Sequence, residues 1–222
     1  MTKPSPTLDL LRAAKIVPVI RTPSARHAAT AVQWLYDSGI RIFEITLTIP
    51  DAVSLIRDLA SDPALLVGAG TVPDAAAAAA CLSAGARFIV APWVDSTLKR
   101  PCEEAQALLM LGALTPSEVR AALAAGAGAV KIFPASSAGG PAHIRALRSV
   151  FPKQVFCPTG GVEPENIAEY LSAGADFVGI GGALVAVKHI EAGNREAIQA
   201  VARSVVAAVG APAVDTSAIG RP

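Results

Sequence analysis

Cysteine, excess charge of either sign and long apolar runs are all scarce in this chain, and each scarcity argues against a class of protein. The three cysteines among 222 residues, Cys81, Cys102 and Cys157, have spacings that fit neither a disulfide framework nor a zinc site. We therefore expect reduced, mostly buried thiols, as in intracellular proteins. Basic residues number 19 and acidic residues 18, and this net charge of +1 argues against a nucleic-acid or membrane-surface partner. No apolar run reaches the roughly 18 residues that span a bilayer, and the polar N-terminus is unlike a signal peptide, so we expect a cytoplasmic location.

Groups of metal ligands are missing as well. The three histidines, His27, His143 and His189, fall in segments of helical composition or in loops, and no cluster of His, Asp and Glu has the spacing of a metal site. Acidic residues other than Glu44 are nearly absent from the ends of the predicted strands. We expect no bound metal ion.

Short β-branched runs alternate with alanine-rich segments along a chain that is 52% apolar. The runs are Ile16–Arg21, Arg41–Thr48, Leu65–Thr71, Arg87–Pro92, Ala107–Gly112, Ala129–Phe133, Gln154–Thr159 and Phe177–Gly181. A segment of helical composition follows each run, and such strict alternation predicts parallel strands joined by crossover helices. Eight units in a chain of this length predict an α/β fold, the (β/α)8 TIM barrel.

Further patterns predict how helices end and where the barrel stops. A short motif, a glycine between two small or apolar residues, recurs before every second predicted strand, and each of these glycines should end a helix in a left-handed cap. These glycines are Gly39, Gly85, Gly126 and Gly174. Leucines within residues 1–14 predict a short N-terminal helix that plugs the bottom of the barrel. We expect a single barrel domain over residues 1–209 and a flexible C-terminal tail, rich in small residues, over 210–222.

The predicted strand Arg41–Thr48 places a carboxylate in the barrel interior. Side chains alternate with a period of two along a strand. Phe43, Ile45 and Leu47 form the apolar face toward the helices, so Glu44 should point inward. A carboxylate in an apolar interior needs a partner or a function, and a structural ion pair is the alternative to a catalytic role.

The predicted strand around Lys131 places an amine in the same interior. Val130 and Ile132 should face the helices, and Lys131 should face inward together with Phe133. Burial disfavours the ammonium form, and a neutral amine can attack a carbonyl. The alternative is a silent salt bridge with Glu44, although a buried pair seldom offsets its own desolvation.

Two glycine pairs predict an anion site at the top of the barrel. Gly160 and Gly161 follow one of the last two predicted strands, and Gly181 and Gly182 end the other. Barrel enzymes often bind phosphate with the loops after these two strands, where glycine lets backbone N–H groups approach the anion. We predict phosphate or carboxylate binding there.

Other strand ends offer groups to a small ligand. Thr71 presents a hydroxyl after a run of small residues, and Pro92 ends the next strand. The Arg21 guanidinium, at the end of the first strand, suits a carboxylate or phosphate, and a solvated arginine is the alternative.

Together, four motifs resemble those of the 2-keto-3-deoxy-6-phosphogluconate/4-hydroxy-2-oxoglutarate aldolases, in that family's order and over about residues 10 to 208. They are Glu44-Ile45-Thr46-Leu47, Gly68-Ala69-Gly70-Thr71-Val72, Lys131-Ile132-Phe133-Pro134-Ala135 and Cys157-Pro158-Thr159-Gly160-Gly161-Val162. The resemblance implies a class I aldolase that needs no cofactor and assembles as a homotrimer. It further implies that Lys131 forms the Schiff base, that Glu44 shuttles protons and that Thr71 contacts substrate. Pro92 matches a proline of the family, and the segments that hold phosphate there match Thr159, Gly160, Gly161, Gly181 and Gly182.

Some positions depart from the family's pattern. Thr48 stands where phosphogluconate-type members carry an arginine, and Ala183 stands where they carry a serine. Leu111 precedes Gly112, where a proline is common. Arg21 matches an arginine of another branch, which includes 6-phosphogalactonate-type enzymes. We therefore expect Arg21 to reach the anion that an arginine at position 48 holds in phosphogluconate-type members.

The resulting expectation is reversible cleavage of a 2-keto-3-deoxy-6-phospho sugar acid, of phosphogluconate or phosphogalactonate type, to pyruvate and glyceraldehyde 3-phosphate. A further substrate is 4-hydroxy-2-oxoglutarate. Arg21 and Thr71 should hold the pyruvyl carboxylate, and Phe133 should form an apolar wall beside the imine. The alternatives are a phosphosugar isomerase or epimerase with Glu44 as the base, and a barrel that binds anions without catalysis.

Overall fold

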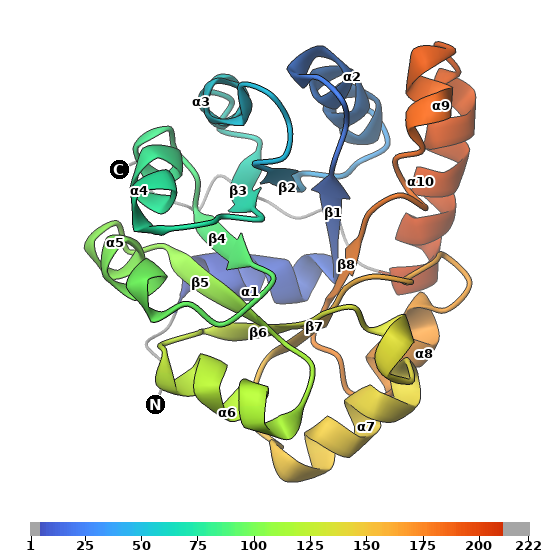
Figure 1. Ribbon diagram of the computed structural model, residues 1–222. Coiled ribbons are helices and arrows are strands. Elements are labelled where there is room, and N and C mark those ends of the chain that lie inside the picture. Colours follow the sequence, from blue (N-terminus) through green and yellow to red (C-terminus); the bar gives the residue numbers. More distant parts are fainter. Residues whose placement is uncertain (1–4, 211–222) are drawn as a thin grey trace.

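The computed structural model describes residues 5–210, which form a barrel of parallel strands inside a layer of helices (Figure 1). The strands are β1 (Ile16–Ile20), β2 (Ile42–Thr46), β3 (Leu66–Gly70), β4 (Phe88–Ala91), β5 (Leu108–Ala113), β6 (Ala129–Ile132), β7 (Phe156–Pro158) and β8 (Val178–Ile180). Neighbours in sequence pair in parallel from β1 to β7, and β8 returns to pair with β1. A bridge between Thr159 and Gly179 joins the end of β7 to β8 and closes the ring. The predicted (β/α)8 barrel is confirmed: a strand forms at each of the eight predicted runs, and β5 extends one residue beyond its run, to Ala113.

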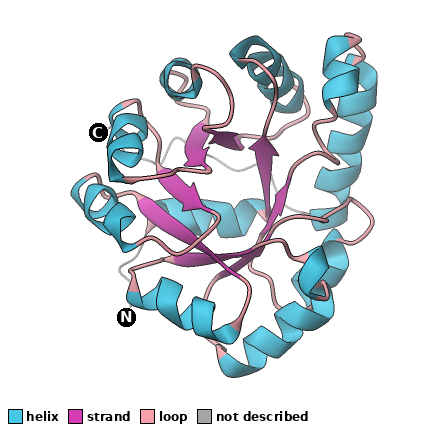
Figure 2. Cartoon of the chain, viewed as in Figure 1, coloured by secondary structure: helices cyan, strands magenta, loops and turns pink. Residues whose placement is uncertain are grey.

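Helices cover the outside of the ring (Figure 2). They are α2 (Ala25–Tyr36), α3 (Ala52–Ala60), α4 (Ala75–Ser83), α5 (Lys99–Glu104), α6 (Pro116–Ala124), α7 (Pro141–Val150), α8 (Ile167–Ser172), α9 (Val187–Glu191) and α10 (Arg195–Val209). The 3₁₀ turns Ser96–Leu98 and Ser136–Ala138 precede α5 and α7. Side chains fix several starts: Ser24 caps α2, and Thr115 with Glu118 forms a capping box at α6. The four glycines predicted to follow helices have φ between +93° and +104°, a region that favours glycine.

The apolar side chains divide between two sides of the barrel wall. Phe43 and Ile45 of β2, and Val130 and Ile132 of β6, pack toward the helices. A second cluster fills the barrel interior, and it contains Ile42, Leu66, Phe88, Val90, Leu108, Met110, Ala129 and Cys157. The alternation predicted for the second and sixth strands is therefore correct.

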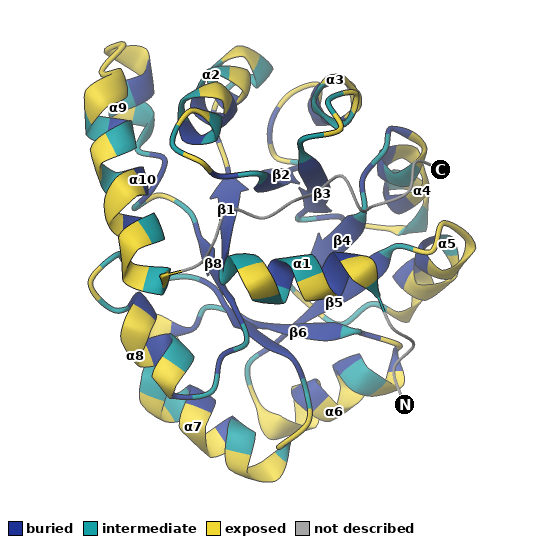
Figure 3. Ribbon diagram, turned by 180° about the vertical axis from the view of Figure 1, so that it is seen from behind, coloured by how far each residue is buried: buried dark blue, intermediate teal, exposed yellow. Residues whose placement is uncertain are grey.

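The N-terminal helix α1 (Pro6–Ala14) closes one end of the barrel. Seen from behind, it lies across the end where the strands begin (Figure 3). Leu8 and Leu11 are buried in the interior cluster, and full burial of one leucine is worth about 1.5–3 kcal/mol. The predicted plug is confirmed.

The flexible C-terminal tail expected from the sequence stays a prediction. Helix α10 ends at Val209, and Gly210 follows it in a left-handed conformation. The proposed flexible tail of 210–222 lies, beyond Gly210, outside the described residues. Within residues 5–210, no helix has the length and hydropathy needed to cross a membrane.

Candidate active site

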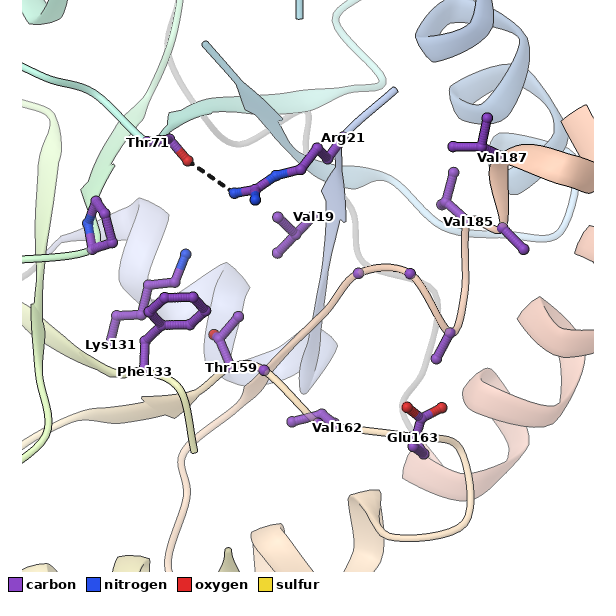
Figure 4. A pocket seen from close by; sticks show the side chains of 17 residues that line it. Val19, Arg21, Thr71, Lys131, Phe133, Thr159, Val162, Glu163, Val185 and Val187 are labelled. Atoms are coloured by element: carbon purple, nitrogen blue, oxygen red, sulfur yellow. Dashed lines mark hydrogen bonds between the residues drawn. The ribbon is translucent and has the colours of Figure 1, made fainter. Parts of the chain in front are cut away.

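A cavity of about 750 Å³ opens where the strands end, opposite α1. Its walls come from the end of β1 and from the segments that follow β3, β4, β6, β7 and β8 (Figure 4). In barrels of this type, catalytic groups gather at this end of the strands.

A buried ion pair lies at the inner end of the cavity. The Lys131 Nζ of β6 is 3.2 Å from the Glu44 Oε1 of β2, and the two side chains are 6% and 4% exposed. Glycine at position 70 makes this possible, because a Cβ there would collide with the Glu44 carboxylate. Lys131 lines the cavity, whereas Glu44 stands behind it and does not reach the cavity wall. Both side chains point inward as predicted, but only the lysine faces the space where a ligand would lie.

The surroundings of Lys131 leave its amine open to a ligand. Among residues 5–210, Glu44 is the one hydrogen-bond partner recorded for Nζ, although an ammonium has three donors. The Phe133 ring centroid is 5.5 Å from Nζ and forms the adjoining wall. Cys157 lies beside Lys131 in the β6–β7 register, and burial raises the pKa of its thiol to about 12. The thiol is therefore neutral and leaves Lys131 and Glu44 as the charged pair of this layer.

Arg21 and Thr71 meet at the rim. The Arg21 Nη2 donates a hydrogen bond to the Thr71 Oγ1 over 3.3 Å, and both residues line the cavity. Thr71 has φ of +56°, which is unusual for a β-branched residue. Strain of this kind tends to gather at functional sites and holds the hydroxyl in one place.

Glycines shape the cavity wall in the loop that follows β7. Gly160 and Gly161 have φ of +87° and +73°, and a Cβ on Gly161 would collide with the Ser136 side chain. Asn166 fixes this loop: its Nδ2 donates to the Gly161 carbonyl, and its Oδ1 accepts from the Glu163 N–H, each over 3.0 Å. The loop therefore brings its backbone close to the cavity without side chains in between.

The structure brings the sequence-predicted residues together. All nine predicted to bind substrate or phosphate line the cavity with Lys131: Arg21, Thr71, Pro92, Phe133, Thr159, Gly160, Gly161, Gly181 and Gly182. Thr48 is exposed and is not among the lining residues. The sequence reasoning missed Val19, Val162, Glu163, Ala183, Val185, Ala186 and Val187. Val19 could have been found by alternation, because it stands two residues before Arg21, and Glu163 by its place directly after the Thr-Gly-Gly-Val motif.

The three histidines lie in α2, α7 and α9, and none of them is among the residues that line the cavity. Within the described part of the chain, no group of three or more His, Cys, Asp or Glu side chains is arranged to hold a metal ion.

A lysine and a carboxylate held together at the catalytic end of a parallel barrel, beside a rim of arginine, threonine and glycine, are the parts that a lysine-dependent aldolase requires. Comparison with known proteins gives the family. The model of the KDPG and KHG aldolases matches residues 8–201, and the chain belongs to this family. It is an aldolase and therefore a carbon–carbon lyase.

Relatives support this assignment over nearly the whole chain. The 2-dehydro-3-deoxy-phosphogluconate aldolase of Dickeya dadantii is 34% identical over 90% of this chain and 94% of its own. The KHG/KDPG aldolase of Escherichia coli K12 is 34% identical over 89% of this chain and 93% of its own. Among solved structures, a KDPG aldolase of Legionella pneumophila, with pyruvate captured as a covalent carbinolamine, is 31% identical. It superposes with a TM-score of 0.81 over 89% of this chain and 97% of its own.

Proposed function

We propose that this class I aldolase cleaves 2-keto-3-deoxy-6-phospho sugar acids, of phosphogluconate or phosphogalactonate type, to pyruvate and glyceraldehyde 3-phosphate through a Schiff base on Lys131. The observation that carries the proposal is the Lys131–Glu44 pair, because the amine faces the cavity while the carboxylate stands 3.2 Å behind it. The relatives named for KDPG and for KHG extend the proposed substrates to 4-hydroxy-2-oxoglutarate. We further propose that the enzyme works in the cytoplasm as a homotrimer.

The proposed reaction begins when the Lys131 ammonium passes a proton to Glu44, and the resulting neutral amine attacks the keto carbon. The carbinolamine loses water to give an iminium, for which Glu44 supplies the proton that the departing hydroxyl needs. The Glu44 carboxylate, through a water, then takes the proton of the substrate's C4 hydroxyl. The bond between C3 and C4 breaks, its electron pair moves into the iminium, and the aldehyde leaves an enamine on Lys131. Protonation of the enamine carbon and hydrolysis of the imine release pyruvate and restore the amine.

The cavity wall suits each part of such a substrate. The Arg21 guanidinium and the Thr71 hydroxyl are the proposed partners of the pyruvyl carboxylate, since a charge-assisted pair fits this anion. Phe133 is the proposed apolar wall beside the imine. The backbone of Gly160, Gly161, Gly181 and Gly182 is the proposed site of the terminal phosphate. The lysine itself acts as the electron sink, so the proposed chemistry uses no metal and no cofactor.

Reductive trapping tests the proposal. Borohydride added with pyruvate should attach one reduced pyruvyl group per chain, at Lys131, as mapped by mass spectrometry of the digested protein. The exposed Lys153 serves as an internal control and should remain unmodified. Modification of another lysine, or none in an active preparation, would contradict the Schiff base and favour the isomerase or epimerase with Glu44 as base. Activity should also survive exhaustive chelation with EDTA.

A further inference from the structure

Two opposite sides of the cavity carry opposite charge. Lys131 lies at the inner end, and Arg21 lies on the rim near Thr71. The opposite wall is built from Val162, Val185 and other apolar residues, and its one charged group is the Glu163 carboxylate. Figure 4 shows Glu163 on the side of the cavity away from Lys131, with its carboxylate turned toward the chain that leads to Val185. A substrate that puts its keto group on Lys131 thus extends its far end toward an acid.

The backbone of Glu163 is held in place, whereas its side chain is exposed and left unneutralised. Its backbone N–H donates to the Asn166 Oδ1 over 3.0 Å, so the loop position is fixed. Within residues 5–210, no ion pair involves its carboxylate, and every cation on the cavity wall belongs to Lys131 or Arg21. Ala183, in the segment after β8, adds no hydroxyl donor to this wall. The distal wall therefore combines backbone N–H groups, apolar side chains and one uncompensated negative charge.

We infer that Glu163 determines specificity: it disfavours a phosphate dianion at the far end of the substrate and favours an uncharged hydroxyl tail. This inference rests on the proposed function and refines its substrate class to include the unphosphorylated 2-keto-3-deoxy sugar acids. A phosphate group carries about −1.5 to −2 charges at neutral pH, so the carboxylate repels it. The hydroxyls of an unphosphorylated tail can instead donate hydrogen bonds to the same carboxylate.

The test compares kcat/KM for phosphorylated and unphosphorylated 2-keto-3-deoxygluconate in the wild-type enzyme and in Glu163→Gln, which keeps the shape and removes the charge. The variant should raise kcat/KM for the phosphorylated acid by about 5- to 10-fold at low salt, through a lower KM, which is the scale of charge repulsion at ~6 Å in a watery environment. The gain should shrink as salt rises. For the unphosphorylated acid, kcat/KM should fall by about 2- to 5-fold, because the glutamine oxygen accepts a weaker, neutral hydrogen bond from the hydroxyl tail. Glu165→Gln is the matched control, because Glu165 is exposed nearby but does not line the cavity, and it should change neither value.

A second measurement keeps this inference separate from the proposed function. The affinity for inorganic phosphate, measured by titration calorimetry, should rise by a similar factor in Glu163→Gln and stay unchanged in Glu165→Gln. An unchanged substrate ratio, or a gain of equal size in Glu165→Gln, would overturn the role of Glu163 while leaving the aldolase reaction intact. Failure of pyruvate to label Lys131 would overturn the reaction itself, whatever the phosphate titration shows.

Discussion

The two ends of the barrel hold charged side chains in opposite ways. Where the strands begin, the Asp176 carboxylate accepts from Arg12 of α1 over 3.2 Å, from Arg148 of α7 over 2.8 Å and from the Phe156 N–H over 3.0 Å. Arg148 also donates to the Gly174 carbonyl and stacks over the Phe156 ring. Where the strands end, Lys131 and Glu44 share one hydrogen bond.

This difference separates a structural network from a reactive one. The two Asp176 carboxylate oxygens together have partners on three elements, so the network ties α1, α7 and β7 together. Lys131 has donors left over and a cavity in front of it. The hydrogen bonds of the Asp176 network stabilise the fold where the strands begin. The Lys131 amine, where the strands end, can therefore keep donors free for a ligand without loss of the fold.

Lys131→Arg should have the largest effect, a loss of detectable turnover with the fold retained. The guanidinium preserves the positive charge beside Glu44 but stays protonated and cannot attack a carbonyl. Steady-state assays and pyruvate trapping measure the loss, and circular dichroism verifies the fold. Turnover near the wild-type rate would remove Lys131 from the chemistry and make the two ends of the barrel alike.

Glu44→Gln should lower the rate about 100- to 10,000-fold, the usual range for a general acid or base. Pyruvate trapping should slow as well, because carbinolamine dehydration uses the same proton. Single-turnover kinetics with borohydride quench would follow both steps. If turnover and trapping stayed at wild-type rates, Glu44 would be a structural partner like Asp176.

Asp176→Asn should reduce stability by about 2–3 kcal/mol while kcat of the folded enzyme remains unchanged, because it leaves two arginines short of a charged partner. Urea titration would measure the free energy of unfolding. Asp37→Asn is the control: Asp37 pairs with a half-exposed Arg195, and such surface pairs are worth about 0–1 kcal/mol. Equal losses in both variants would mean that burial does not strengthen the network.

The pH dependence of stability should contain a contribution from Cys157, which lies beside Lys131 on the neighbouring strand. Burial raises the pKa of this thiol to about 12 in the folded protein, against about 8.5 when unfolded. A raised folded pKa means that this stabilisation is complete below pH ~8.5 and is lost as the pH rises toward 12, by about 1.4 kcal/mol per pH unit. Cys157→Ser should flatten the fall in unfolding free energy between pH ~9.5 and ~10.5. An identical slope in both proteins would place the thiol in a wetter environment than the strand register indicates.

Thr71→Gly should have the smallest effect on stability, a gain of about 0.5–1 kcal/mol, because glycine relieves the positive φ but adds freedom to the unfolded chain. Removal of the hydroxyl should at the same time raise KM for pyruvate-containing substrates. Thermal unfolding and steady-state kinetics test the two effects. A loss of stability would show that the Arg21 hydrogen bond outweighs the backbone strain.

Much of the reactive end was predictable because strands impose a period of two. The apolar neighbours of Glu44 and Lys131 face the helices, so the alternation alone turns both charges inward. It cannot predict that Glu44 stands behind Lys131, because that depth depends on strand stagger and on the space that Gly70 leaves. The partnership of Arg21 with Thr71 depends likewise on two loops that the pattern does not position.

Loops explain the residues that were missed. Glu163 and Val185 follow strands but belong to no periodic segment, so their orientation comes from local contacts such as the Asn166 hydrogen bonds. Asp176 was overlooked for a related reason. Its partners lie 164 and 28 residues away in sequence, and only the closed barrel brings them together.

Helix α1 also limits how molecules can enter and leave the barrel. Leu8 and Leu11 fill the barrel below Lys131, so the cavity is closed at that end and opens where the strands end. In the proposed reaction the aldehyde must leave before pyruvate, because pyruvate is still bound covalently to Lys131 after cleavage, and in the synthetic direction pyruvate must bind first. Both products leave by the same mouth, since α1 fills the other end of the barrel. This compulsory order would appear in the pattern of product inhibition.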